Sequence, residues 1–93
     1  MSTEEIIEGN KLIAEFMGDD FSYHSDWSWL MPVVEKIEYD LPNDYYFNTN
    51  HNQVWFESVQ GKFERIDIVQ GGRIAATYKS VLQFINYYNN KLK

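Results

Sequence analysis

The feature that most constrains the fold of this chain is an apolar stripe near its C-terminus. Apolar residues recur there at spacings of 4, 3, 4, 3 and 4, which is the footprint of one face of an α-helix. Two consecutive glycines, Gly71 and Gly72, break the preceding pattern. The spacing therefore predicts a helix over residues 73–90 that lies on the surface formed by the rest of the chain. The stripe consists of Ile74, Tyr78, Val81, Ile85, Tyr88 and Leu92, and Leu82 and Phe84 flank it.

A second helical pattern occupies the N-terminus. Ser2 stands three residues before a glutamate, which is the spacing of a capping box, and apolar residues then recur at about the helical period. Gly18 suits the position just after a helix end. The pattern predicts a helix over residues 3–17. Because glycine lowers helix stability by about 1 kcal/mol relative to alanine, Gly9 leaves open a helix that begins only near Asn10.

The stretch YHSDWSWLMPVVEKIE, from Tyr23 to Glu38, predicts another helix. Ser25 or Asp26 can cap it. Pro32 would cost about 3 kcal/mol in a helix interior but little in a first turn. We therefore expect one helix over residues 25–39 with an irregular first turn. Its predicted buried stripe consists of Trp27, Leu30, Met31, Val34 and Ile37.

Between this helix and the C-terminal stripe, the pattern changes to that of strands. Residues 39–52 are rich in Asp, Asn and Thr and predict a loop with one short strand near 44–48. QVWFESV (53–59) and KFERIDIV (62–69) alternate apolar and polar residues, and the QGK between them predicts a hairpin turn. The sequence thus predicts one α+β domain over residues 1–93, in the order α-α-β-β-β-α, with an antiparallel sheet packed against helices.

Length and composition limit the class of protein. The 93 residues suffice for one small domain. With no cysteine, the chain has neither a disulfide framework nor a thiolate metal site. The N-terminus does not have the layout of a signal peptide, and no apolar run approaches the roughly 20 residues of a membrane span. We therefore expect a cytoplasmic protein that does not contact a membrane.

The net charge of −6 is unevenly distributed. Residues 1–50 carry eleven carboxylates and two lysines, a net −9, whereas residues 51–93 carry three carboxylates and six cations, a net +3. The two halves can attract one another within one fold, or the acidic half can face a basic partner. Direct binding to nucleic acid is not expected, because affinity for phosphates comes mainly from clustered lysine and arginine.

The reactive side chains do not form a convincing catalytic group. His24 and Asp26 could form a histidine–carboxylate pair, with Ser22, Ser25 and Ser28 as nearby nucleophiles. Residues two apart on a helix face different directions, and no loop suited to an oxyanion hole accompanies them. We therefore expect no catalytic residue and interpret Ser25 or Asp26 as a helix cap.

Metal and anion signals are equally weak. His24, His51 and the scattered carboxylates lack metal-ligand spacing, so no metal or cofactor is expected, and Asp19 with Asp20 is interpreted as a solvated loop pair. QGGR (70–73) resembles half of an anion-binding turn because a helix follows it. It also fits a tight connection between a strand and a helix, which is our interpretation.

The aromatic residues give the one positive indication of a site. Trp27 and Trp29 are two residues apart, so they cannot both face the core from one helix. If Trp27 is buried, Trp29 points to solvent or to a partner. Aromatic residues left outside the core would form a surface of the kind enriched at interfaces, unless a second layer of this small domain covers them. The candidate interface residues are Tyr23, Trp29, Tyr45, Tyr46 and Tyr87.

Three stretches of the chain resemble a known family. NKLIAEFMG (10–18), YHSDWSWLMPVVEKIE (23–38) and AATYKSVLQFINYYN (75–89) are similar to segments of a family of small proteins encoded by tailed phages and prophages. The resemblance implies a phage or prophage origin and a location in the host cytoplasm, but no activity or catalytic residues. Members often carry a longer, strand-like insert between the first two motifs, whereas only residues 19–22 intervene here. This departure from the family pattern leaves open whether an activity borne by that insert is retained.

Together these observations predict a non-enzymatic, acidic interaction protein. Its expected partner is a host or phage protein, with self-association as a further possibility. One alternative is a small enzyme or ligand-binding domain, which would require a pocket with converging polar groups. Another is an acidic inhibitor that mimics DNA, although −6 over 93 residues is a modest charge for that role.

Overall fold

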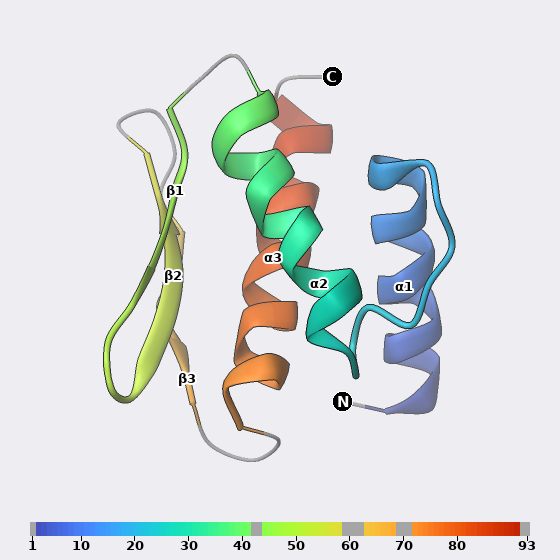
Figure 1. Cartoon of the computed structure of the whole chain (residues 1–93), viewed down its shortest axis with the longest axis horizontal. Helices are drawn as coiled ribbons and strands as arrows, with labels where there is room; N and C mark the ends of the chain where they lie inside the picture. Colours follow the sequence, from blue (N-terminus) through green and yellow to red (C-terminus); the bar gives the residue numbers. More distant parts are fainter. Residues whose placement is uncertain (1, 42–43, 59–62, 69–71, 92–93) are drawn as a thin grey trace.

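In the computed structural model, α3 lies between a three-stranded sheet on one side and α1 on the other, and α2 runs beside α3 (Figure 1). Residues 2–41, 44–58, 63–68 and 72–91 are described. The predicted α+β class, the element order and the antiparallel sheet are confirmed. The elements are α1 (Thr3–Met17), α2 (Trp27–Glu35), the π-helical turn η1 (Lys36–Asp40), β1 (Tyr46–Thr49), β2 (Gln53–Glu57), β3 (Ile66–Asp67) and α3 (Gly72–Lys91).

Helix α1 has the predicted bounds and caps. The Ser2 hydroxyl accepts a hydrogen bond from the N–H of Glu5, and the Glu5 carboxylate accepts one from the N–H of Ser2. These two bonds satisfy donors that a helix start leaves free. At the other end Gly18 adopts φ 86°, and its N–H donates to the carbonyl of Ala14. A left-handed residue in this position closes a helix, and glycine adopts it without strain.

The helix runs through Gly9 without a break, so the alternative start near Asn10 is wrong. Gly9 is buried against α3. A Cβ at this position would overlap the Tyr78 hydroxyl and would lie 2.9 Å from Cδ1 of Leu82. Glycine therefore permits the close approach of the two helices, and this contact compensates for its low helix propensity.

Helix α2 begins regularly, which corrects the prediction of an irregular first turn. Asp26 is the N-cap, and its carboxylate accepts a hydrogen bond of 2.8 Å from the N–H of Ser28. Pro32 lies inside the helix. The irregularity is at the other end, where residues 36–40 form a π-helical turn. Pro32 removes one backbone donor inside the helix, but the capped first turn stays regular.

The buried face of α2 differs from the predicted stripe. Leu30, Val34 and Ile37 are buried as expected, whereas Trp27 and Met31 are each 38% exposed. Val33 is buried in their place. Residues 30, 33, 34 and 37 share one side of a helix. The face turned to the core is therefore rotated toward Val33 and away from Met31, compared with the predicted stripe. Trp27, in the first position of the helix, lies at the margin of this face.

Helix α3 is buried on two sides because it packs against β2 and β3 as well as against α1 and α2. Tyr78, Val81 and Ile85 of the predicted stripe are buried, and Leu92 lies outside the described residues. Phe84, predicted at the flank of the stripe, is fully buried. A helix with neighbours on two sides buries a wider face than one apolar stripe indicates.

The sheet has the order β1-β2-β3, with both pairs antiparallel. Val54 and Phe56 of β2 are buried. The strands are shorter than predicted, and β3 has only two residues. Just before β3, the N–H of Glu64 donates to the side-chain oxygen of Gln83 on α3, so this backbone group bonds to the helix and not to β2. The predicted hairpin turn at 60–62 lies outside the described residues.

The edge of β1 is partly covered by η1. The N–H of Phe47 donates to the Glu38 carboxylate at 3.1 Å, so this donor does not point toward the neighbouring strand. A free strand edge is a template for pairing with another chain, and a side chain that takes up an edge N–H reduces that hazard. Among the described helices, none combines the length and apolar character needed to cross a membrane.

Candidate functional site

Two aromatic side chains come to the surface where the loop of residues 18–26 meets α2. We call Phe21 and Trp29 the aromatic surface; each of them is 38% exposed. Trp27 and Met31 are equally exposed, but each is two positions from Trp29, about 200° around the helix, so they lie on the other flank of α2. The rings of Phe21 and Trp29 stack in parallel, with centroids 3.9 Å apart and an interplanar angle of 0°. The loop therefore delivers one aromatic ring directly onto the first turn of the helix.

Two of the five predicted interface residues are buried, which is a correction. Tyr23 is 1% exposed, and its hydroxyl donates to the backbone carbonyl of Asp19, so the loop folds over its own tyrosine. Tyr45 is 0% exposed, and its ring meets that of Phe84 edge-on at 4.8 Å. Both rings supply apolar area to a small core, whereas the prediction had left them outside it.

The other three predicted residues lie on three different elements. Trp29 belongs to the aromatic surface on α2, whereas Tyr46 on β1 is 54% exposed. Tyr87 on α3 is half-buried against the ring of Phe63. The structure therefore does not bring the five residues into one patch, and their binding role stays a prediction.

Sequence reasoning missed Phe21, Trp27 and Met31. Trp27 and Met31 were assigned to the core from helical period alone, and their spacing of four residues puts them on one side of α2 in either case. Phe21 stands in a loop, where periodicity carries no information. Asp19 and Asp20 just before it were the only local sign that this segment is close to solvent.

His24 and Asp26 have separate partners. The Asp26 carboxylate caps α2 through Ser28, whereas Nδ1 of His24 lies 3.0 Å from the side-chain nitrogen of Asn10. The amide nitrogen of Asn10 can only donate, so Nδ1 of His24 is the acceptor of this bond. This arrangement fixes the loop against α1 and does not pair the histidine with a carboxylate.

Asn10 also belongs to a polar network that joins α1 to α3. The buried Tyr78 hydroxyl is 3.1 Å from the Ile6 carbonyl oxygen and 2.9 Å from Oδ1 of Asn10, both of which can accept its proton. Burial raises the pKa of Tyr78 to about 12. The phenol is therefore neutral at physiological pH and acts as a donor that holds the helices and the loop together.

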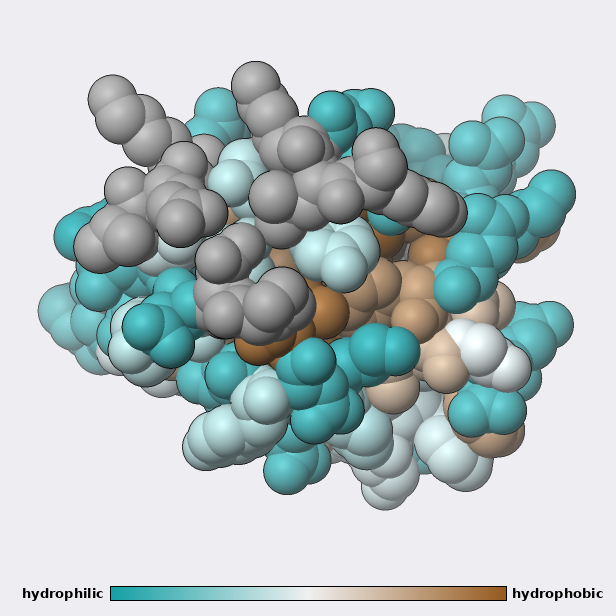
Figure 2. Space-filling model, turned by 90° about the horizontal axis from the view of Figure 1, so that it is seen from above, coloured by the Kyte–Doolittle hydropathy of each residue, from teal (hydrophilic) through white to brown (hydrophobic). Residues whose placement is uncertain are grey.

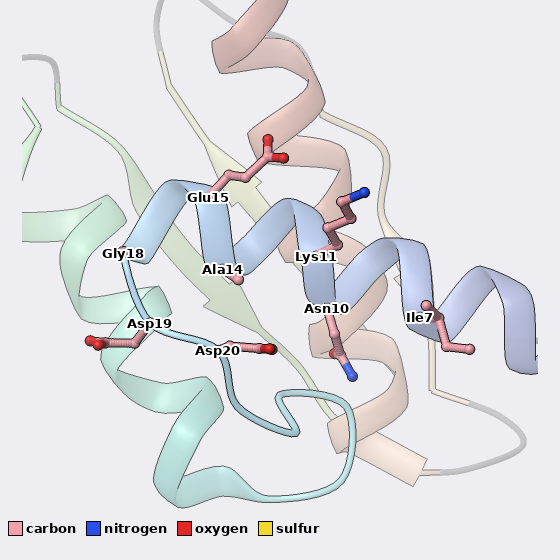
Figure 3. A pocket seen from close by; sticks show the side chains of 8 residues that line it. All are labelled: Ile7, Asn10, Lys11, Ala14, Glu15, Gly18, Asp19 and Asp20. Atoms are coloured by element: carbon pink, nitrogen blue, oxygen red, sulfur yellow. The ribbon is translucent and has the colours of Figure 1, made fainter.

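A groove runs between α1 and the segment of the loop that follows it. Its volume is about 740 Å³, and it is open to solvent. Figure 3 shows the side chains of Asn10 and Asp20 directed into the space between helix and loop, with Asp19 directed away from it. Ile7, at the far end of the groove, is 62% exposed. The lining residues are Ile7, Asn10, Lys11, Ala14, Glu15, Gly18, Asp19 and Asp20.

The groove has a negative electrostatic environment. Burial raises the pKa of the Tyr23 hydroxyl, and the negative charges of Asp19 and Asp20 raise that pKa further. Glu15 adds a third carboxylate to the lining, and Lys11 is the one cation among the described residues that line the groove. Apolar and acidic groups are thus combined in one open depression, which suits a partner that is itself both apolar and basic.

The other features noted in the sequence are accounted for by structural contacts. Arg73 donates to the Thr49 hydroxyl and, at 3.3 Å, to the Asn50 carbonyl, so it ties the start of α3 to the β1–β2 turn. Gln70 and Gly71 of the possible anion-binding turn lie outside the described residues. Within the part of the chain that is described, no three His, Asp or Glu side chains are placed to hold a metal ion.

A second, smaller hollow opens at the end of the molecule where α3 finishes. Seen from this end, apolar residues reach the surface within a rim of hydrophilic ones (Figure 2). Phe16, Leu41 and Tyr88 line the hollow together with Glu15 and Lys36, and its volume is about 250 Å³. Lys36 is already engaged there, because it donates to the Phe16 carbonyl and lies over the Phe16 ring. We assign no site to this hollow.

Comparison of the chain with models of protein families, with curated proteins and with solved structures finds no match.

Proposed function

We propose that the protein is a non-enzymatic interaction domain that binds a protein partner through the aromatic surface. The observation that carries this proposal is the parallel stack of Phe21 on Trp29 at an exposed position. Trp27 and Met31 are exposed on the other flank of the same helix and are not part of this stack. Exposed apolar patches rimmed by polar residues are typical of interaction sites, and tryptophan is the residue most enriched among those that contribute strongly to binding.

The stack favours binding because its two rings are already ordered. A side chain that is fixed before association loses less conformational entropy when the complex forms. Asp26 contributes indirectly, since its cap holds the first turn of α2 from which both tryptophans project. A partner can therefore contact a preformed apolar platform.

The hydrogen bonds of the two tyrosines with raised pKa support a binding role over a catalytic one. The Tyr78 and Tyr23 hydroxyls both face backbone carbonyl oxygens as acceptors. Burial is the main cause of the raised pKa in each case. A perturbed pKa is a sign of catalysis only when the group can reach a substrate, and these groups serve the interior of the domain.

The resemblance to small phage and prophage proteins predicts a partner in the host cytoplasm, either a host protein or another phage protein. This origin and this location stay predictions, since they depend on the quoted motifs alone. They determine where a partner should be sought first, namely in an extract of a bacterial host.

The proposal is tested by quantitative capture from such an extract with matched baits. The wild-type protein, Trp29→Ala and Tyr39→Ala are immobilised at equal density, and bound proteins are quantified; Tyr39 on η1 is exposed and lies outside the candidate interface. We expect a partner recovered by the wild type and by Tyr39→Ala, and depleted at least several-fold by Trp29→Ala, because truncating a central aromatic residue removes much of the binding energy. Equal recovery by all three baits would contradict the proposal. Sedimentation of the pure protein separates self-association from partner binding.

A further inference from the structure

We propose that the groove between α1 and residues 18–20 binds a lysine or arginine side chain of the partner, so that the partner docks through a segment that is both basic and apolar. This inference rests on the proposed function and adds the chemistry of the partner. The groove and the aromatic surface are parts of one continuous segment, because Asp20 directly precedes Phe21.

The charge of the molecule is concentrated on this segment. Residues 1–26, which form α1 and the loop, carry seven carboxylates and a single lysine. Residues 27–93 carry seven carboxylates and seven cations, so α1 and the loop hold the entire net charge of −6. An approaching basic segment is therefore attracted to the side of the molecule that bears the groove.

The groove can accommodate both parts of a long cationic side chain. Ile7 and Ala14 supply apolar surface along which an alkyl stem can lie, and the Asp20 carboxylate points into the same space (Figure 3). Lysine and arginine commonly bury their stems on apolar surface while the charged group stays near water. Within the described residues no cation forms an ion pair with Asp20, so its carboxylate is available to a partner.

The position of these carboxylates relative to α1 is unfavourable in the free protein. Glu15 lies in the last turn of α1, and Asp19 and Asp20 follow its C-cap. The C-terminal end of a helix carries partial negative charge, so carboxylates there are repelled. The last turn of α1 contains no basic residue of its own, although Lys36 from η1 contacts the Phe16 carbonyl. A cation in the groove would relieve the remaining repulsion.

A second copy of the chain suits the groove poorly. In a symmetric dimer formed through the groove, the exposed side of α1 would face the same side of another molecule, and α1 carries Glu4, Glu5, Glu8 and Glu15 against Lys11. Like charges brought together across an interface oppose association. The charge distribution therefore favours a basic segment of a different protein.

The test uses three synthetic peptides of about fourteen residues, a length that gives about four helical turns. The first is an amphipathic sequence of leucine and lysine, the second has glutamate for every lysine, and the third has serine for every leucine. None contains an aromatic residue, so the tryptophan fluorescence of the protein reports binding. We expect the leucine–lysine peptide to bind at least about tenfold more tightly than either of the others, because it alone matches both the charge and the apolar area.

Two protein variants locate the contact. Asp20→Asn removes a charge inside the groove, and Glu57→Gln removes an equal charge from the exposed end of β2. We expect Asp20→Asn to weaken binding of the leucine–lysine peptide about three- to tenfold, and Glu57→Gln to weaken it less than about twofold. A charge close to its partner interacts more strongly than a distant, screened one. Both variants should melt like the wild type, because both side chains are exposed.

Each other outcome overturns the inference in a recognisable way. Equal weakening by Asp20→Asn and Glu57→Gln would mean attraction to the overall charge and no use of the groove. If the lysine and glutamate peptides bound with equal affinity and Trp29→Ala abolished both, the aromatic surface would bind apolar segments of either charge. That result would overturn this inference and leave the proposed function standing. The inference would also be overturned if the leucine–lysine peptide did not bind. It would equally be overturned if the protein sedimented as a dimer and Asp20→Asn dissociated that dimer.

Discussion

The aromatic side chains around Phe84 and those of the aromatic surface are arranged in opposite ways. Phe84 is fully buried, and six rings lie around it. Most of them meet it edge-on or at a tilt. Phe21 and Trp29 instead lie parallel and remain 38% exposed. The rings around Phe84 are those of Phe16, Tyr45, Phe56, Phe63, Tyr87 and Tyr88.

The difference indicates what each group contributes. The rings around Phe84 come from α1, from β2, from the residues just before β1 and β3, and from α3. They therefore join segments far apart in the sequence and remove a large apolar area from water. The Phe21–Trp29 stack joins residues eight positions apart and leaves an outer ring face open to solvent. We therefore expect the Phe84 group to determine stability and the aromatic surface to determine binding. The four predictions below test this division, from the largest expected effect to the smallest.

Phe84→Ala should cost about 3–5 kcal/mol of unfolding free energy, because it leaves a cavity at the centre of the aromatic group. For a small domain whose stability is on the order of 5–15 kcal/mol, this is a large fraction of the total. Urea unfolding followed by circular dichroism measures the change. Phe84→Leu, which retains most of the volume, is the control and should lose much less. A Phe84→Ala variant as stable as the wild type would remove the basis of the comparison.

Gly9→Ala should destabilise the protein by about 1–3 kcal/mol, because the added methyl group overlaps the Tyr78 hydroxyl and contacts Leu82. In an exposed helix the same change stabilises by about 1 kcal/mol, so the sign of the effect is decisive. Thermal unfolding of Gly9→Ala is compared with that of Ala14→Gly, which should lose only helix propensity. Stabilisation by Gly9→Ala would show that α1 and α3 are farther apart than described.

The raised pKa of Tyr78 predicts loss of stability at alkaline pH. An unfolded tyrosine ionises near its ordinary pKa of about 10, whereas the folded one ionises near about 12. The unfolded state therefore loses its proton first, so the contribution of Tyr78 to stability is fully present below pH 10 and is lost as the pH rises from 10 to 12. Tyr23, whose pKa is also raised, acts in the same direction.

Tyr78→Phe separates the contribution of this residue. The variant should lose about 1–2 kcal/mol at neutral pH, since the hydrogen bonding of the hydroxyl to Ile6 and Asn10 is removed. It should also show a shallower decline of unfolding free energy above pH 10 than the wild type, measured by urea titrations at a series of pH values. An unchanged slope would assign the alkaline transition to other groups.

Trp29→Ala and Trp27→Ala should have the smallest effect on stability, about 1 kcal/mol or less each, because both side chains keep substantial solvent contact. Thermal melts of the two variants measure this directly. A loss of 3 kcal/mol or more in either variant, similar to that expected for Phe84→Ala, would assign that tryptophan to the core.

The sequence predicts local features of this fold well. The capping box at Ser2 and the glycine at position 18 determine the bounds of α1 without any knowledge of its neighbours. Helix α3 follows from the spacing of its apolar residues. These signals depend only on residues within one or two turns of each other, so one sequence is sufficient to read them.

Features that depend on distant residues were not predicted. The burial of Tyr23 and Tyr45 depends on how a loop and a strand end fold back onto the helices. The burial of Phe84 depends on the position of α3 between the sheet and α1. The close packing that favours glycine at position 9 depends on Tyr78, sixty-nine positions away. Local periodicity contains none of this information, which is why Trp27 and Met31 on α2 were assigned to the core and Phe21 was missed.

The central position of α3 has a consequence for the order of folding. This helix follows α1, α2 and the sheet in the sequence and is therefore synthesised after them, yet both the sheet and α1 pack against it. Until α3 has left the ribosome, the earlier segments have no common surface on which to bury their apolar residues. The contacts between α1 and α3 close a long loop of intervening chain. Closing a long loop slows folding. We therefore expect the nascent chain to stay unfolded until α3 has emerged and then to fold in a single cooperative step.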